Sequence, residues 1–252
     1  MERSERSYAN AARRYMEKHY LYWREPSVVT RFGSKNVTDF FRSEAYFLDQ
    51  IAPSVRSVFD IGCASGRFIE LFRHYTQEFT YAGLDLSLES IQNARRLYPD
   101  SRFFHGNSLD FSIPETFDLV NATGVCQHEP HFEELIQNMI QWSHRYVLFD
   151  VKLAAISDHL IDLKLAYRYD PPIYFIVLSL DRLKAFLQSQ KALSKISVFG
   201  YATPRDNRTI LPETIGELVS ASVLLEKSSG PEGTDASIRL ELPEWLMGDS
   251  RS

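Results

Sequence analysis

The chain lacks the features that would tie it to a metal, a membrane or an oxidising compartment. Its two cysteines, Cys63 and Cys126, give neither a disulfide framework nor a Cys-x-x-Cys spacing, so we expect no metal. No apolar run approaches the roughly 20 residues that are needed to cross a bilayer. Residues 1–14 are polar and charged, without the apolar centre of a signal peptide. These absences predict a cytoplasmic protein with no membrane partner.

The chain also has no strong excess of charge of either sign. Its 28 basic and 33 acidic residues are spread along the sequence and leave a formal net charge of −5. Bulk charge therefore gives no reason to expect nucleic acid as a partner. The apolar fraction of 44% is ordinary for a globular protein of this length. Because no repeat, low-complexity tract or clear linker divides the sequence, we expect a single domain over residues 1–252.

Apolar strands and helical stretches alternate from residue 55 onward. Seven strands are predicted, at 55–60, 79–85, 102–105, 117–122, 146–151, 194–201 and 222–226. Strands separated by helices or long crossings indicate an α/β fold with a doubly wound, Rossmann-like and mostly parallel sheet. Ligands of such sheets bind beyond the C-terminal ends of the strands. Residues 237–242 are expected to pair back across the Gly-Pro turn at 230–233.

The sequence outside the alternating core divides into further segments. Residues 1–53 are expected to be helical, 54–152 to form the core, 153–193 to be an insertion before the sixth strand, and 194–252 to hold the last strands. Within the insertion, 158–169 is predicted to be helical, and Asp181 is expected to cap a helix that ends at Gln188.

The N-terminal stretch 8–23 has the pattern of a helix rich in aromatic residues. Such a stripe usually packs on a core, which is the interpretation we favour. Alternatively, the helix could lie as a lid over a ligand site, because it precedes the first strand and is free to cross the edge of the sheet.

Residues 58–68, with the sequence VFDIGCASGRF, combine a strand, a tight turn and the start of a helix. This arrangement presents backbone N–H groups to an anionic or polar ligand. A dinucleotide-binding turn has the spacing G-x-G-x-x-G. Aligning its first glycine on Gly62 places Ala64 and Arg67 at the other two glycine positions. Arg67 removes the close helix–strand packing that the third glycine allows, so the pattern does not favour a dinucleotide.

The spacing Asp60-x-Gly62-x-Ala64-x-Gly66 instead resembles motif I of the class I S-adenosylmethionine-dependent methyltransferases, with Ala64 in place of the middle glycine. The order of the elements through residue 151 is also that of the methyltransferase core. The resemblance implies S-adenosylmethionine as cofactor and S-adenosylhomocysteine as product. The cofactor-binding residues that it implies are Asp60, Gly62, Cys63, Ala64, Gly66, Asp85, Leu86, Asn107, Ser108 and Thr123.

Individual roles also follow from the resemblance. Asp85 would bind the two ribose hydroxyls, since a carboxylate offers acceptors only. Leu86 would pack on the adenine. Asn107 and the backbone of Ser108 would bind the edge of the adenine, although Asn107 could equally be a turn residue. Thr123 follows the fourth strand, beside the methionine part of the cofactor.

Methyl transfer needs no covalent enzyme intermediate, and much of its acceleration can come from positioning. The candidate general bases are His128, Asp150 and His131, although His128 could equally belong to the loop framework. The candidate acceptor-binding residues are Tyr15, Tyr22, Tyr169 and Arg205. The loop that carries Arg205 could bind a carboxylate or phosphate, or be a solvated turn.

These patterns predict a methyltransferase that acts on an oxygen or nitrogen of a small-molecule or metabolite acceptor. A non-catalytic, methyltransferase-like module that binds the cofactor or a partner is the alternative. A homodimer could form through the insertion, but the sequence does not decide the oligomeric state.

Overall fold

The computed structural model describes residues 20–28, 42–76, 78–162, 165, 173–204, 209–228 and 235–247. Its strands are β1 (Ser57–Ile61), β2 (Thr80–Asp85), β3 (Arg102–His105), β4 (Phe117–Ala122), β5 (Ser143–Ala154), β6 (Leu160–Asp162), β7 (Phe175–Ser179), β8 (Leu193–Thr203), β9 (Leu218–Lys227) and β10 (Ser237–Glu241). Its helices are α3 (Arg42–Ile51), α4 (Phe68–Tyr75), α5 (Leu88–Leu97), α6 (Phe132–Trp142), α7 (Leu180–Gln188) and α8 (Glu244–Met247), with 3-10 turns η2 (Ala52–Ser54) and η3 (Cys126–His128).

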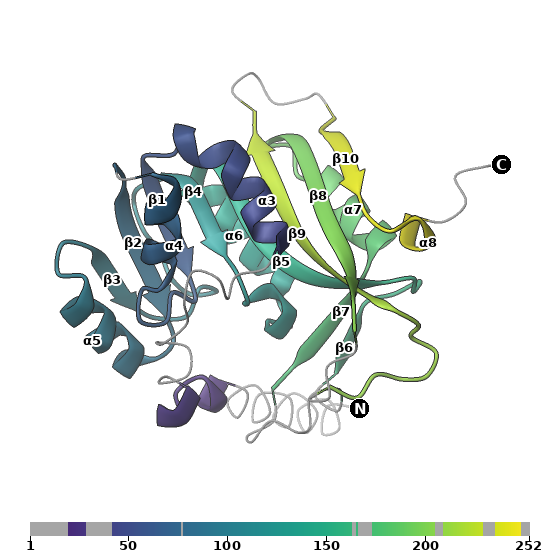
Figure 1. The fold of residues 1–252 in the computed structure, drawn as a ribbon, viewed down its shortest axis with the longest axis horizontal. Coiled ribbons are helices and arrows are strands. Elements are labelled where there is room, and N and C mark those ends of the chain that lie inside the picture. Colours follow the sequence, from purple (N-terminus) through teal and green to yellow (C-terminus); the bar gives the residue numbers. More distant parts are fainter. Residues whose placement is uncertain are drawn as a thin grey trace, which may run out of the picture.

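The strands form one sheet in the order β10-β8-β9-β5-β4-β1-β2-β3 (Figure 1). Strands β1 to β5 run parallel to one another. Strand β9 is antiparallel to both of its neighbours, β5 and β8. The chain builds outward from β1 to β3 and then returns to place β4 on the other side of β1. This reversal is the switch point at which doubly wound sheets bind ligands. The predicted fold class is therefore confirmed.

Helices cover both faces of the sheet, as the alternation of side chains along each strand requires. On one face α3, α4 and α5 pack against residues such as Val58 and Leu119. On the other face α6 and α7 pack against Phe59 and Val120, which are the next residues along the same strands (Figure 1). Among the helices that the structure describes, none is both long enough and apolar enough to cross a membrane.

The insertion before the sixth predicted strand differs from the expectation. Within the segment 158–169 predicted to be helical, Leu160–Asp162 is strand β6, which pairs antiparallel with β7. Strand β5 continues to Ala154, beyond its predicted end, and Leu153 there pairs with Leu178 of β7. The apolar residues Phe175–Ser179 thus form a fully buried strand, β7. Ser179, and not Asp181, caps α7, because its side chain accepts from the backbone N–H of Arg182.

The last strand also has a different partner from the predicted one. Strand β10 pairs parallel with β8 and not with β9 across the Gly-Pro turn. Both edges of β9 are already occupied, by β5 and by β8, so β10 adds to the free edge of β8. Among the described residues the sheet has ten strands, which are the seven predicted ones, the returning segment at β10, and the two unpredicted strands β6 and β7.

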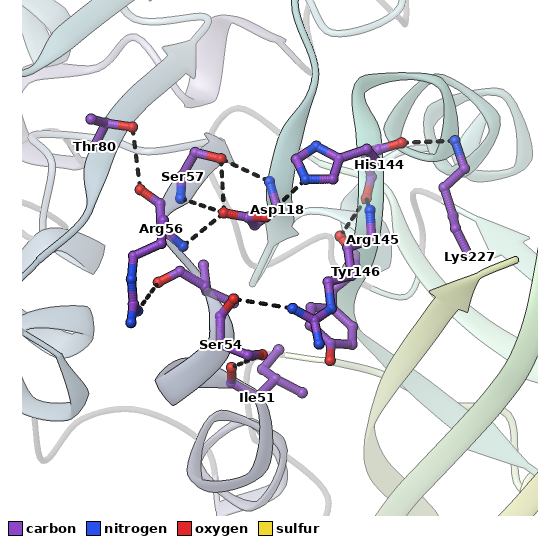
Figure 2. A network of polar contacts seen from close by, with 12 residues as sticks. Ile51, Ser54, Arg56, Ser57, Thr80, Asp118, His144, Arg145, Tyr146 and Lys227 are labelled. Carbon is purple, nitrogen blue, oxygen red and sulfur yellow. Dashed lines mark hydrogen bonds and ion pairs between the residues drawn. The ribbon is translucent and has the colours of Figure 1, made fainter. Parts of the chain in front are cut away.

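The N-terminal ends of β1, β4 and β5 are tied together by Asp118. One carboxylate oxygen accepts from the backbone N–H groups of Arg56 and Ser57 at 2.7 and 2.9 Å, and the other is 2.8 Å from His144 Nε2 (Figure 2). Partial burial acts to raise the pKa of Asp118, but the bonds from Arg56, His144 and Ser57 outweigh it and lower the pKa below its ordinary value. This network lies at the N-terminal ends of the parallel strands, opposite the ends at which doubly wound sheets bind ligands.

Candidate functional site

The turn between β1 and α4 passes through left-handed backbone conformations. Gly62, Ala64 and Gly66 have φ angles of +70°, +48° and +84°. Glycine adopts this region freely, whereas an L-residue such as Ala64 loses about 1–2 kcal/mol in it. A Cβ atom on Gly62 would also lie 2.5 Å from Val125 Cγ2. The turn therefore requires glycine at position 62 and tolerates a strained alanine at position 64.

Asp85, the last residue of β2, holds this turn in place. Its Oδ2 accepts from the N–H of Ala64 at 2.9 Å, and its Oδ1 accepts from the N–H of Ser87 at 2.7 Å. Desolvation raises the pKa of Asp85, against the two backbone bonds, which favour the ionised form. Each oxygen has a second lone pair, so the carboxylate can still accept two hydrogen bonds from a ligand.

A cleft with about 900 Å³ of empty space, counted out to open solvent, lies at the C-terminal ends of β1 to β4. Helical turns at residues 20–28 (purple in Figure 1) lie at the same end of the sheet and contribute to the wall. Of the predicted site residues, those that line the cleft are Gly62, Ala64, Asp85, Leu86, Asn107, Ser108, Thr123 and His128.

Three predicted cofactor residues lie behind the wall and not on it. Asp60 is 4% exposed and accepts from Tyr81 Oη at 2.5 Å and from Asn121 Nδ2 at 2.7 Å. Burial raises the pKa of Asp60 to about 6, although these two bonds act to lower it. Cys63 is buried against β2, and Gly66 approaches a tyrosine ring of the neighbouring loop. These residues support the turn without lining the cleft.

Asn107 combines the two roles that the sequence left open. Its Oδ1 accepts from the N–H of Leu109 at 3.1 Å, which is a turn-forming bond within the loop after β3. The residue also lines the cleft, next to Ser108. The turn thus aims the polar groups of this loop at the space beside Leu86.

Two of the proposed general bases do not reach the cleft. Asp150 is 4% exposed, and its Oδ1 accepts from the N–H of Gly124 at 2.5 Å. The side chain of Asp150 points from β5 to the loop after β4, and this bond holds the loop in place. His131 is exposed at the start of α6 and is not part of the cleft wall. Of the three candidates, only His128 lines the cleft.

His128 is oriented by a backbone contact. Its Nδ1 lies 2.9 Å from the carbonyl oxygen of Tyr174. Because a carbonyl only accepts, Nδ1 carries a proton, which leaves Nε2 as the acceptor nitrogen whenever the ring is neutral. The ring packs 5.2 Å from that of Trp23, measured between centroids. Glu129 lies beside it and accepts from Tyr20 Oη at 3.1 Å. Desolvation raises the pKa of Glu129.

The N-terminal aromatic residues face in two directions. Tyr22 is 6% exposed and packs in an apolar cluster with Ile173 and Phe175, so it does not line the cleft as predicted. Tyr20 and Trp23, its neighbours, do line the cleft. Residues 20–23 therefore both pack on a core and line the cleft. Tyr15, Tyr169 and Arg205 lie outside the described residues.

Sequence reasoning missed several residues of the wall. Arg67 was used only to argue against a dinucleotide, yet it lines the cleft at the β1–α4 turn. Its position directly after the glycine turn was a usable signal. Glu129, Tyr20 and Trp23 were not assigned to the site, and no local pattern distinguishes Tyr20 from the core-facing Tyr22. The described residues contain no group of His, Cys, Asp and Glu side chains that could hold a metal.

Comparisons with known proteins point to one family. Residues 58–145 match the family model described as methyltransferase domain. Over 88 residues the chain is 31% identical to the dTDP-3-amino-3,4,6-trideoxy-alpha-D-glucopyranose N,N-dimethyltransferase of Streptomyces venezuelae, covering 34% of this chain and 33% of that protein. It is 28% identical over 88 residues to the trans-aconitate 2-methyltransferase of Rhodopseudomonas palustris (strain BisB5), covering 33% and 34%. Each match thus spans about a third of the relative's length.

The similarity in structure extends further than the similarity in sequence. The crystal structure of the N-terminal domain of EvdMO1 with S-adenosylhomocysteine bound matches with a TM-score of 0.58, over 77% of this chain and 82% of that one. The sequence identity between the two is 13%. This likeness concerns the fold, which includes the sheet and the covering helices described above.

Proposed function

Residues 58–145 form a class I methyltransferase domain, and from this premise we propose that the protein transfers a methyl group from S-adenosylmethionine to a small-molecule acceptor. The observation that carries the proposal is the position of Asp85 in the cleft. It lies at the switch point of the sheet, with both oxygens held by backbone N–H groups and a lone pair left on each. Such a preorganised pair of acceptors suits the two hydroxyls of a ribose.

The other residues of the cleft fit the remaining parts of this cofactor. With the ribose on Asp85, the adenine is proposed to lie toward Leu86 and Asn107, and the amino-acid part toward β1 and β4, which lie on the other side of β2; the lining of the cleft at both ends supports this direction. Arg67 lines that second half. Its guanidinium is suited to bind the carboxylate of the amino acid. The cofactor supplies an electrophilic methyl group on a sulfonium, and the chain supplies binding and alignment.

The acceptor is proposed to bind beside His128, Glu129, Tyr20 and Trp23. The aromatic rings would exclude water and orient the acceptor. The Nε2 atom of His128 is the basic nitrogen of the neutral ring, so it is suited to take a proton from a hydroxyl or ammonium group. Glu129 would accept a hydrogen bond from the same group. This arrangement supports an oxygen or a nitrogen as the methylated atom.

Mass spectrometry of the purified protein, with a search for bound S-adenosylmethionine or S-adenosylhomocysteine, tests the cofactor. Titration calorimetry of the ligand-free protein with each compound should show binding to one site. An absence of binding with up to millimolar ligand would rule out the proposed function. Transfer of a labelled methyl group from the cofactor into a metabolite extract then tests for turnover.

A non-catalytic, methyltransferase-like module is the second candidate, and Ala64 is the one departure from the family motif in the turn. This residue places a methyl group on the turn where the family motif has glycine, and it lines the cleft. Binding of the cofactor with no label transferred to any acceptor fraction would support the module over the enzyme.

A further inference from the structure

Glu44, in the first turn of α3, is a buried acid that no sequence motif singled out. Its side chain is 0% exposed. One oxygen, Oε1, contacts the hydroxyl of Thr123. The other, Oε2, has no hydrogen-bond partner among the described residues. Burying an ionised carboxylate with an unpartnered oxygen costs free energy of folding. The contacts around Glu44 indicate which protonation state avoids this cost.

A count of protons around Thr123 identifies this state. Asn121 donates from Nδ2 to Asp60 at 2.7 Å, which turns its Oδ1 toward the Thr123 hydroxyl, 3.0 Å away. Thr123 Oγ1 is within donating reach of both Glu44 Oε1 and Asn121 Oδ1, but its single proton can serve only one of them, so both contacts are hydrogen bonds only when Glu44 carries a proton of its own. The proton in the contact between Glu44 and Thr123 must then come from Glu44. A neutral Glu44 therefore satisfies both contacts of the Thr123 hydroxyl, whereas its Oε2 still has no partner among the described residues.

The charges around Glu44 agree with this count. The titratable and charged groups that act on it are Asp60 from β1, Arg67 from the β1–α4 turn, Asp150 from β5 and Tyr75 from α4. Burial raises the pKa of Glu44 to about 8, and the carboxylates of Asp150 and Asp60 add to this effect. The hydrogen bond with Thr123 and the charge of Arg67 oppose it. Additional positive charge nearby would therefore favour its ionised form.

The cleft is where such a charge can arrive. Thr123 and Arg67 both line it, directly in front of Glu44. S-adenosylmethionine carries a sulfonium, whereas S-adenosylhomocysteine carries a neutral thioether, so the two ligands differ by one positive charge. We propose, on the basis of the proposed function, that Glu44 is a proton-linked positioning residue, neutral in the empty or product-filled cleft and ionised when the cationic cofactor is bound.

The proposed step is a simple proton release. The O–H bond of Glu44 breaks, the electron pair stays on the carboxylate, and the proton leaves through the Thr123 hydroxyl and the cleft to the buffer. The ionised carboxylate then attracts the sulfonium of the cofactor. It has no such attraction for the neutral thioether of the product. Cofactor and product would thus be distinguished by a residue that touches neither directly.

Titration calorimetry in buffers of different ionisation enthalpy measures the released protons. At pH 7.5, binding of S-adenosylmethionine should release more than half a proton, because Glu44 is mostly protonated below a pKa of about 8. Binding of S-adenosylhomocysteine should release distinctly less. The affinity for S-adenosylmethionine should rise by up to tenfold per pH unit from pH 6.5 to 8, and level off above that, as one-proton linkage requires.

The variant Glu44→Gln keeps the size of the side chain and removes its ionisation. It should lower the proton release with S-adenosylmethionine to the level seen with S-adenosylhomocysteine, and remove the corresponding rise in affinity with pH. Because the ligands' own amino groups titrate equally with both proteins, their contribution cancels in the comparison. Glu70→Gln, which alters an exposed glutamate of α4, is the matched control and should leave the proton release unchanged.

The wild-type measurement decides the proposal even if Glu44→Gln does not fold, once the proton release with each ligand is corrected for that ligand's own amino group, titrated in free solution. Equal proton release with the two ligands would overturn the role of Glu44 while leaving the proposed function intact. An unchanged pH slope in folded Glu44→Gln would overturn it as well. If neither ligand binds, the proposed function fails first, and the inference fails with it.

Discussion

Replacing Asp85 by alanine tests the proposed orientation of the cofactor. If the carboxylate accepts from two ribose hydroxyls, each bond contributes about 1.5–3 kcal/mol, as expected for hydrogen bonds to a charged group. That energy corresponds to roughly a 10- to 150-fold change in Kd for each hydroxyl. However, Asp85 also holds the backbone N–H groups of Ala64 and Ser87. A loss of affinity alone would therefore not separate ligand contact from support of the turn.

A double-mutant cycle makes that separation. The wild type and Asp85→Ala are each titrated calorimetrically with S-adenosylhomocysteine and with its 2′-deoxy analogue. The wild type should bind the analogue roughly 10- to 150-fold more weakly, as the value of one charged hydrogen bond predicts. The variant should lose less than about twofold, because its partner for the hydroxyl is already absent. Circular dichroism checks that the variant is folded.

The cycle can also refute the reasoning. If both proteins lose the same factor when the 2′-hydroxyl is removed, the two changes are additive and the hydroxyl does not contact Asp85. The ribose would then lie elsewhere in the cleft. Asp100→Ala, which alters an exposed acid after α5, is the control for the change in net charge and should behave like the wild type.

Three further predictions concern stability. Ala64→Gly should raise the free energy of unfolding in urea by about 0.5–1 kcal/mol, since the strain of the left-handed alanine exceeds the added chain entropy of glycine; lower stability would contradict this. Gly62→Ala should cost more than about 2 kcal/mol, because its φ is +70° and its Cβ would meet Val125, and Val125→Ala should restore part of the loss. Asp118→Asn should cost about 1–2 kcal/mol at pH 7. The pKa of Asp118 is lowered by folding, so its contribution is present above the ordinary carboxyl pKa of about 3.9 and is lost as the pH falls through the folded value. The difference between wild type and variant should thus shrink below pH 4 in acid titrations followed by circular dichroism.

Local pattern was sufficient for the elements that position the site. Residues 102–105 and 117–122 form strands with the predicted bounds, and Ser87 caps α5 by accepting from the N–H of Ser90 at 3.2 Å. Asp85 ends its strand, and the glycine turn lies between β1 and α4. These features depend on neighbours within a few residues, so their periodicity and capping signals are written in the sequence itself.

Parts of the structure that depend on distant neighbours could not be read in this way. The partner of β10 was decided by which sheet edge remained open, and β7 became a strand because β5 extends far enough to pair with it. The same holds within the cleft. Asp150 lies under a loop that its own strand does not contain, and Tyr20 faces the ligand space whereas Tyr22 faces a core.

By itself, the sequence determined the strand–turn–helix that begins at β1, the acid that follows β2 and the class of the fold, because each is encoded by local spacing. Only the tertiary structure decided what surrounds them. Glu44 is separated from Thr123 by 79 positions, and its protonation depends on Asn121, Asp60 and the burial of its side chain where α3 packs on the sheet. No local pattern carries that information, since the proton count exists only once these elements have packed together.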